Sequence, residues 1–160
     1  MGKIDDAIAR MAGQHVYLDT NVFVYFLDRT PDYFSVVAPI IAAVESGLIL
    51  GHTGDAAIAE TLVKPYQTGN LALAASFKAF FGMDNFLSIQ SHDAEIFDLT
   101  AQLRAERGLK FIDALHYATA IQAGCKFFVT SDGGIQSSDV LEVIAVRALL
   151  DDLSRDLDKR

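Results

Sequence analysis

Short apolar runs alternate with segments of helical periodicity along most of this chain, and this alternation constrains the fold more than any other feature. Residues 16–18, 48–50, 86–89 and 127–129 are predicted strands, and a last strand is expected near Val143. Uninterrupted apolar strands that are separated by helices are typical of a parallel sheet covered on both faces. We therefore expect a three-layer α/β/α sandwich with a central, mostly parallel sheet.

Residues that start or stop helices divide the segments between these strands. Asp19 and Asn21 favour a helix start directly after the first strand, and Gly108 and Gly124 favour helix ends. Helices are expected over residues 4–11, after Asp19, from Pro31 to Gly47, over 53–66, 71–81, 92–107 and 112–123, and finally through Leu153.

The chain has the size and composition of one globular domain. It has 160 residues, of which 51% are hydrophobic and 21% charged, and this balance excludes a disordered chain. There is no Ser/Gly linker and no internal repeat. We expect residues 1–15 to form a helical extension, residues 16–153 to form the folded domain and residues 154–160 to form a polar tail.

Charge and cysteine content limit the partners and the location. Thirteen Lys and Arg against 21 Asp and Glu give a net charge of −8, which repels a polyanion unless a bound cation or a basic patch intervenes. The single cysteine, the mixed charges at the N-terminus and the short longest apolar stretch (residues 33–44) favour a cytoplasmic protein without a membrane span. The mean hydropathy of +0.26 hints at an interface with a partner or a second copy.

Four carboxylates stand where ligands bind in open α/β sheets, which is beyond the carboxyl ends of the strands. Asp19 directly follows the first strand, Asp132 follows the fourth strand, Asp113 opens a helix and Glu60 lies in an apolar helical segment. Each alone has an ordinary interpretation as a helix cap, a turn residue or a solvated side chain. Together they predict a shared acidic site.

Such a site has a chemical consequence. Neighbouring carboxylates raise one another's pKa, and a divalent cation removes the conflict. Ligation by oxygen alone favours Mg²⁺ or Mn²⁺ over zinc, and Mg²⁺ retains waters, one of which can attack a phosphodiester. The carboxylates therefore predict metal-assisted hydrolysis.

Four segments resemble, in the same order, the four motifs of PIN-domain nucleases. They are Leu-Asp-Thr-Asn at 18–21, Ala-Glu-Thr-Leu-Val-Lys-Pro at 59–65, Phe-Ile-Asp-Ala-Leu-His-Tyr-Ala-Thr-Ala at 111–120 and Val-Thr-Ser-Asp at 129–132. Within that family the chain is most similar to the VapC-like toxins of toxin–antitoxin modules, which are Mg²⁺-dependent endoribonucleases.

This resemblance implies a role for each matching residue. The catalytic and metal-ligating residues would be Asp19, Glu60, Asp113 and Asp132, holding one or two Mg²⁺ ions or Mn²⁺ as a substitute, with Thr20, Asn21 and Thr130 in support. The resemblance also implies an RNA substrate, a homodimer and a cognate antitoxin whose basic segment places an Arg against the carboxylates.

Other interpretations remain open. The chain could be a PIN-like nuclease that acts on RNA or DNA without an antitoxin, or a catalytically silent module that binds a partner in its acidic groove. His116, three residues after Asp113, is a lesser candidate for a metal ligand or general base. For the cluster of Arg104, Arg107 and Lys110, a solvated helix end is favoured over contact with RNA.

Overall fold

A five-stranded sheet forms the centre of the part of the chain that this computed structural model describes, residues 2–150. The strand order is β3-β2-β1-β4-β5, and every neighbouring pair is parallel. The strands are β1 (His15–Leu18), β2 (Leu50–Gly54), β3 (Ser88–Gln90), β4 (Phe127–Thr130) and β5 (Glu142–Ala145). The prediction of a mostly parallel sheet is confirmed.

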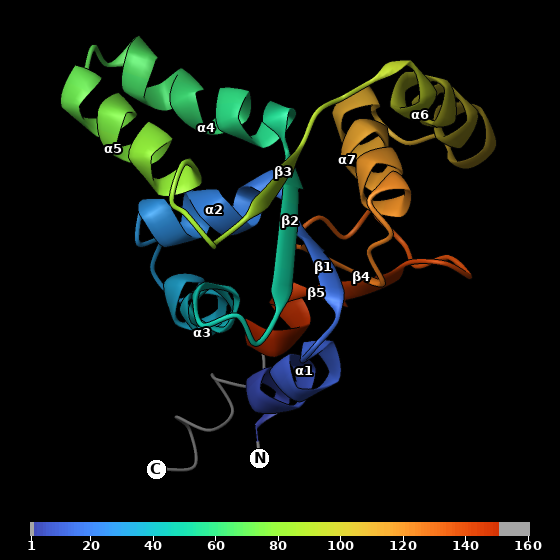
Figure 1. Ribbon diagram of the computed structural model, residues 1–160, viewed down its shortest axis with the longest axis horizontal. Coiled ribbons are helices and arrows are strands. Elements are labelled where there is room, and N and C mark those ends of the chain that lie inside the picture. Colours follow the sequence, from blue (N-terminus) through green and yellow to red (C-terminus); the bar gives the residue numbers. More distant parts are fainter. Residues whose placement is uncertain (1, 151–160) are drawn as a thin grey trace.

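Helices cover both faces of this sheet, so the predicted α/β/α sandwich is also confirmed (Figure 1). One face is covered by α1 (Lys3–Met11), α2 (Thr20–Leu27) and α3 (Phe34–Glu45), and the other by α6 (Ala94–Arg107) and α7 (Phe111–Gln122). A hairpin of α4 (Asp55–Gln67) and α5 (Leu71–Phe81) packs against α2, and residues 146–150 are helical after β5. None of the helices within residues 2–150 is long and apolar enough to cross a membrane.

The central strand β1 contributes to the cores on both faces. Val16 and Leu18 are fully buried in the core beneath α1, α2 and α3, whereas Tyr17 points to the core beneath α6 and α7. Successive side chains of a strand point to opposite faces, so three consecutive apolar residues serve both layers. Tyr17 stacks on Phe128 of β4 with 5.3 Å between the ring centroids.

The second strand differs from the sequence prediction. The strand expected at residues 48–50 runs over residues 50–54 instead, and both Leu48 and Leu50 are exposed. Gly51 lies inside β2, and a Cβ atom there would lie 2.5 Å from Val44 Cγ1 of α3. Thr53, expected in the next helix, is a buried strand residue whose hydroxyl donates to the carbonyl of Leu18.

The helix predicted near the N-terminus is present as α1. Its Met11 is fully buried in the core that also holds Val16, and Arg10 pairs with Glu142 of β5. The division of the chain at residue 16 stays a prediction. The predicted tail, residues 154–160, and the end of the helix predicted through Leu153 lie outside the described residues.

Candidate active site

The four predicted acids all lie near the carboxyl end of the sheet. Asp19 follows β1 and caps α2, and Asp132 comes two residues after β4. Because Leu18 of β1 is paired with Val129 of β4, these two acids leave the sheet on adjacent strands. Glu60 lies in α4, which begins directly after β2, and Asp113 lies in the first turn of α7.

Asp19 is buried, with 5% of its surface exposed, and every predicted supporting residue contacts it. Its Oδ1 accepts a hydrogen bond from the Thr20 amide at 2.8 Å. Its Oδ2 accepts from Thr130 Oγ1 at 2.7 Å and from Asn21 Nδ2 at 3.3 Å. Burial raises the pKa of Asp19 above its ordinary value, although the His116 imidazole and the hydrogen bonds from Thr130 and Thr20 oppose the rise. Asp19 is therefore both a helix cap and a constrained member of the acidic site.

Asn21 connects α2 to the segment that follows β4. Its Nδ2 donates to Thr130 Oγ1 at 3.3 Å, and its Oδ1 accepts from the Ser131 amide at 3.1 Å. The Asp132 amide in turn donates to Thr130 Oγ1 at 3.0 Å. These bonds fix the backbone that carries Asp132 relative to the helix that begins at Asp19.

Asp113 lies close enough to Asp132 for the two side chains to share a hydrogen bond, and this contact raises the pKa of Asp113. Burial and the negative charges of Asp132 and Asp19 together raise the pKa of Asp113 from 3.8 to about 6, although Lys110 opposes the rise. The like-charge conflict predicted from the sequence is therefore present at this position.

Glu60 turns from α4 toward Asp19 and is held by two donors. Its Oε1 accepts from Thr20 Oγ1 at 2.6 Å and from His116 Nε2 at 2.7 Å, while 36% of the side chain remains exposed. Burial raises the pKa of Glu60, but the hydrogen bonds from His116 and Thr20 oppose this rise, and the net effect is a lowered pKa. The two donors thus favour the ionised form of Glu60.

His116, a lesser candidate from the sequence, is a member of the site. It lies fully buried in α7 between Tyr17, whose hydroxyl is 2.7 Å from Nδ1, and Glu60. Its Nε2 is also 3.9 Å from Asp19 Oδ1. The available signal was a histidine inside a continuous apolar helical run, because a buried imidazole needs polar partners.

The donor set fits a hard divalent cation in its chemistry. Asp19, Glu60, Asp113 and Asp132 supply only carboxylate oxygens, and their mutual repulsion is what a cation relieves. Among residues 2–150, no three His, Cys, Asp or Glu side chains are grouped, as they stand, tightly enough to hold a metal ion. The carboxylates would therefore have to converge further on binding one.

The basic residues before Asp113 are engaged with the protein itself. Arg107 donates from its guanidinium to the carbonyls of Gln136 and Ser137, both at 3.3 Å, and lies 5.2 Å from the centroid of the Tyr117 ring. Arg104 lies over the ring of Phe111. The preference for a solvated helix end over contact with RNA stays a prediction.

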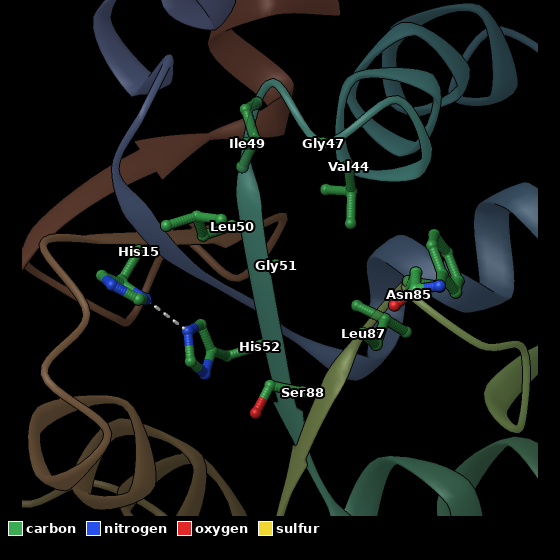
Figure 2. Close-up of a pocket in the computed structure, with 11 residues that line it drawn as sticks. His15, Val44, Gly47, Ile49, Leu50, Gly51, His52, Asn85, Leu87 and Ser88 are labelled. Carbon is green, nitrogen blue, oxygen red and sulfur yellow. Dashed lines mark hydrogen bonds between the residues drawn. The ribbon is translucent and has the colours of Figure 1, made fainter.

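A separate cavity of about 490 Å³ lies at the amino-terminal end of β2, away from the four acids. Figure 2 shows His15 and His52 facing each other in it, with His15 Nδ1 2.8 Å from His52 Nε2. Since the amide of Gln90 donates to His52 Nδ1 at 3.0 Å, His52 Nε2 carries the hydrogen and donates to His15. These hydrogen bonds give both nitrogens of His52 a partner within the chain.

The comparisons with known proteins agree with this architecture. The family model for the PIN domain matches residues 16–140. No curated protein sequence gives a significant match.

Three solved structures have similar folds. The complex VapBC2 from Rickettsia felis, bound to a DNA fragment from its promoter, has a TM-score of 0.59 at 18% identity, covering 81% of this chain and 98% of that chain. VapC20 from Mycobacterium tuberculosis, a toxin that cleaves the sarcin-ricin loop, has a TM-score of 0.61 at 13% identity, covering 74% and 90%. A toxin–antitoxin complex from Klebsiella pneumoniae has a TM-score of 0.60 at 17% identity, covering 82% and 97%. At these identities the likeness shows the fold.

Proposed function

Because this chain belongs to the PIN domain family, we propose that it is a metal-dependent endoribonuclease whose active site consists of Asp19, Glu60, Asp113 and Asp132. The observation that carries the proposal is the electrostatic contact among these acids, which come from four separate segments. Its clearest sign is Asp113, whose pKa is raised to about 6 by burial and by the charges of Asp132 and Asp19. A site in which ionisation of Asp113 is this unfavourable favours a bound cation.

The side chains of this site would hold Mg²⁺, or Mn²⁺ in its place, through carboxylate oxygens. When bound, such an ion supplies a water of lowered pKa and neutralises charge on the phosphate. The protein's own contribution is positional. Thr130 and Asn21 fix the Asp19 carboxylate, Thr20 and His116 hold Glu60 ionised, and the Gly134 amide donates to Asp132 Oδ1 at 2.8 Å.

We further propose that the chain is a VapC-like toxin that forms a homodimer and is neutralised by an antitoxin with a basic segment. The structural neighbours from Rickettsia felis and Klebsiella pneumoniae are toxin–antitoxin complexes. Apolar side chains are exposed on the α4–α5 hairpin, which supports an interface there: Val63, Tyr66, Leu71 and Leu73. A cavity of about 150 Å³ between α2, α4 and α5 is lined by Leu27, Phe77 and Glu60 and joins this apolar surface to the acidic site.

Cleavage of nucleic acid by the purified chain tests the activity. A structured RNA and a DNA of the same sequence are incubated with the protein and Mn²⁺, with and without excess EDTA. We expect cleavage of the RNA that EDTA abolishes and that added Mn²⁺ restores. Cleavage of the DNA alone would favour the alternative nuclease, and no cleavage of a broad RNA library would favour a silent binding module.

A further inference from the structure

His116 is the buried titratable group next to the acidic site to which neither the family motifs nor the proposed hydrolysis assigns a role. It is 1% exposed and makes three close polar contacts. Tyr17 Oη lies 2.7 Å from Nδ1, Glu60 Oε1 lies 2.7 Å from Nε2, and Thr20 Oγ1 lies 3.1 Å from Nε2. The imidazole therefore connects the interior of the sheet to one of the four acids.

The chemistry of the partners fixes the imidazole tautomer. An ionised carboxylate only accepts hydrogen bonds, so the 2.7 Å contact with Glu60 requires the hydrogen on His116 Nε2. In the neutral imidazole Nδ1 then accepts, and the donor is the hydroxyl of Tyr17. Burial raises the pKa of Tyr17 well above its ordinary value, so that this hydroxyl keeps its hydrogen.

Glu60 needs such support because of its place on α4. Its side chain is 36% exposed, and the backbone of this part of α4 belongs to a hairpin that extends beyond the sheet (Figure 1). A free glutamate at a half-exposed helix position populates several rotamers and loses entropy when it is fixed. A rigid hydrogen-bond donor such as His116 Nε2 orders the Glu60 carboxylate in the free protein and so reduces the entropy lost when a ligand binds.

We propose that His116 is a positioning residue that holds the Glu60 carboxylate in the acidic site, with Tyr17 orienting its imidazole. This inference rests on the proposed function, since Glu60 acts as a metal ligand there. In this role His116 acts through Glu60 and is not itself a metal ligand. It acts as the hydrogen-bonded outer partner that metal-binding carboxylates commonly have.

Calorimetric titration of Mn²⁺ into purified variants tests the role without relying on activity. Loss of an outer partner typically weakens metal binding by about 10- to 100-fold, so we expect a weakening of about tenfold for His116→Leu. His116→Gln, which keeps an N–H donor near Nε2, recovers most of the affinity. Tyr17→Phe weakens binding less, and Tyr117→Phe, one residue along α7 with its hydroxyl on the Gln136 carbonyl, leaves it unchanged.

Nitrogen NMR of the metal-free protein tests the contact independently of the proposed function. We expect His116 to show a hydrogen on Nε2 in the wild type and an altered Nε2 resonance in Glu60→Gln. A hydrogen on Nδ1 alone, or a folded His116→Leu that binds Mn²⁺ as tightly as the wild type, would overturn the positioning role. A wild type that binds no Mn²⁺ would overturn the proposed function, and the NMR comparison would then decide the contact alone.

Discussion

The residues of the acidic site differ in how much they contribute to the stability of the folded chain. Asp19 is buried, caps α2 and accepts hydrogen bonds from Thr20, Asn21 and Thr130. Loss of a helix cap costs about 1 kcal/mol, and loss of one member of a buried network leaves the others unpaired. Asp19→Ala therefore combines a loss of stability with any loss of function. Asp113 caps no helix and is the better position for separating the two effects.

Replacing Asp113 with Asn should change the dependence of stability on pH. Its pKa lies at about 6 in the folded protein against an ordinary value of 3.8, so the folded state holds a proton that the unfolded state has lost between these pH values. The stability of the wild type therefore falls as pH rises from about 4 to about 6 through this group. We expect the advantage of Asp113→Asn to grow across that window and to level off above it.

Urea unfolding of both proteins without metal, at several pH values between 4 and 7, measures this difference. Asp84→Asn, a substitution of an exposed acid beyond α5, serves as the control and should track the wild type. A difference between Asp113→Asn and the wild type that stays constant with pH would contradict the electrostatic description of the site.

At the scale of single residues, the sequence pointed to the acids more strongly than to His116, which it offered only as a lesser candidate. The position of an acid directly after a predicted strand carries information, because parallel strands end at a common edge. His116 gains its role from Tyr17, 99 residues away, and from Glu60, 56 residues away. No local pattern records such distant partners, and so only the folded chain reveals them.

Among the elements, the sequence predicts the type of element, helix or strand, where the hydrophobic periodicity is strong. It does not predict the boundaries of an element where tertiary packing decides them. The helix α5 runs over residues 71–81 as predicted, and Gly108 ends α6 in a left-handed conformation. By contrast, the strand predicted over residues 48–50 is β2 at residues 50–54, which includes Gly51. A side chain at Gly51 would need the space that Val44 of α3 occupies, so packing against α3 decides where this glycine lies in the strand.

The carboxyl end of β2 packs closely against Tyr17, whose hydroxyl contacts His116. A Cβ atom on Gly54 would lie 2.8 Å from Tyr17 Oη and 2.6 Å from Cε1 of His92. Because overpacking of a well-packed interior typically costs 1–3 kcal/mol, we expect Gly54→Ala to lower the free energy of unfolding by about that amount. Gly133→Ala, where a Cβ would meet nothing within 4 Å, should change it little.

Chemical denaturation of these two variants beside the wild type measures the effect. Equal stability of Gly54→Ala and the wild type would mean that β2 does not approach Tyr17 as closely as described. A selective loss in Gly54→Ala would show that the strand end and the Tyr17–His116 pair form one packed unit.

For the molecule as a whole, the net charge of −8 opposes the approach of RNA and favours a basic partner. A guanidinium can form paired hydrogen bonds with carboxylates and replace a cation without supplying a reactive water. We therefore expect an Arg-bearing antitoxin peptide to compete with Mn²⁺ for the acidic site, with an affinity that falls as salt rises.

Calorimetry of the peptide with and without Mn²⁺ measures this competition. Asp19→Asn combined with Asp132→Asn should weaken peptide binding, and a Lys-for-Arg peptide should bind less tightly than its parent. A peptide affinity that changes neither with Mn²⁺ nor with these substitutions would place the peptide elsewhere on the surface.

The rate of RNA cleavage by Asp113→Asn, measured beside the wild type with Mn²⁺ and with Asp84→Asn as the control, tests the central claim most directly. A carboxylate in catalytic machinery contributes on the order of a hundredfold or more to the rate, whereas an exposed acid away from the site contributes nothing. We predict that Asp113→Asn loses cleavage to that extent while remaining at least as stable as the wild type, and that Asp84→Asn retains it. Cleavage by Asp113→Asn at the wild-type rate would contradict the assignment of the active site to these four acids.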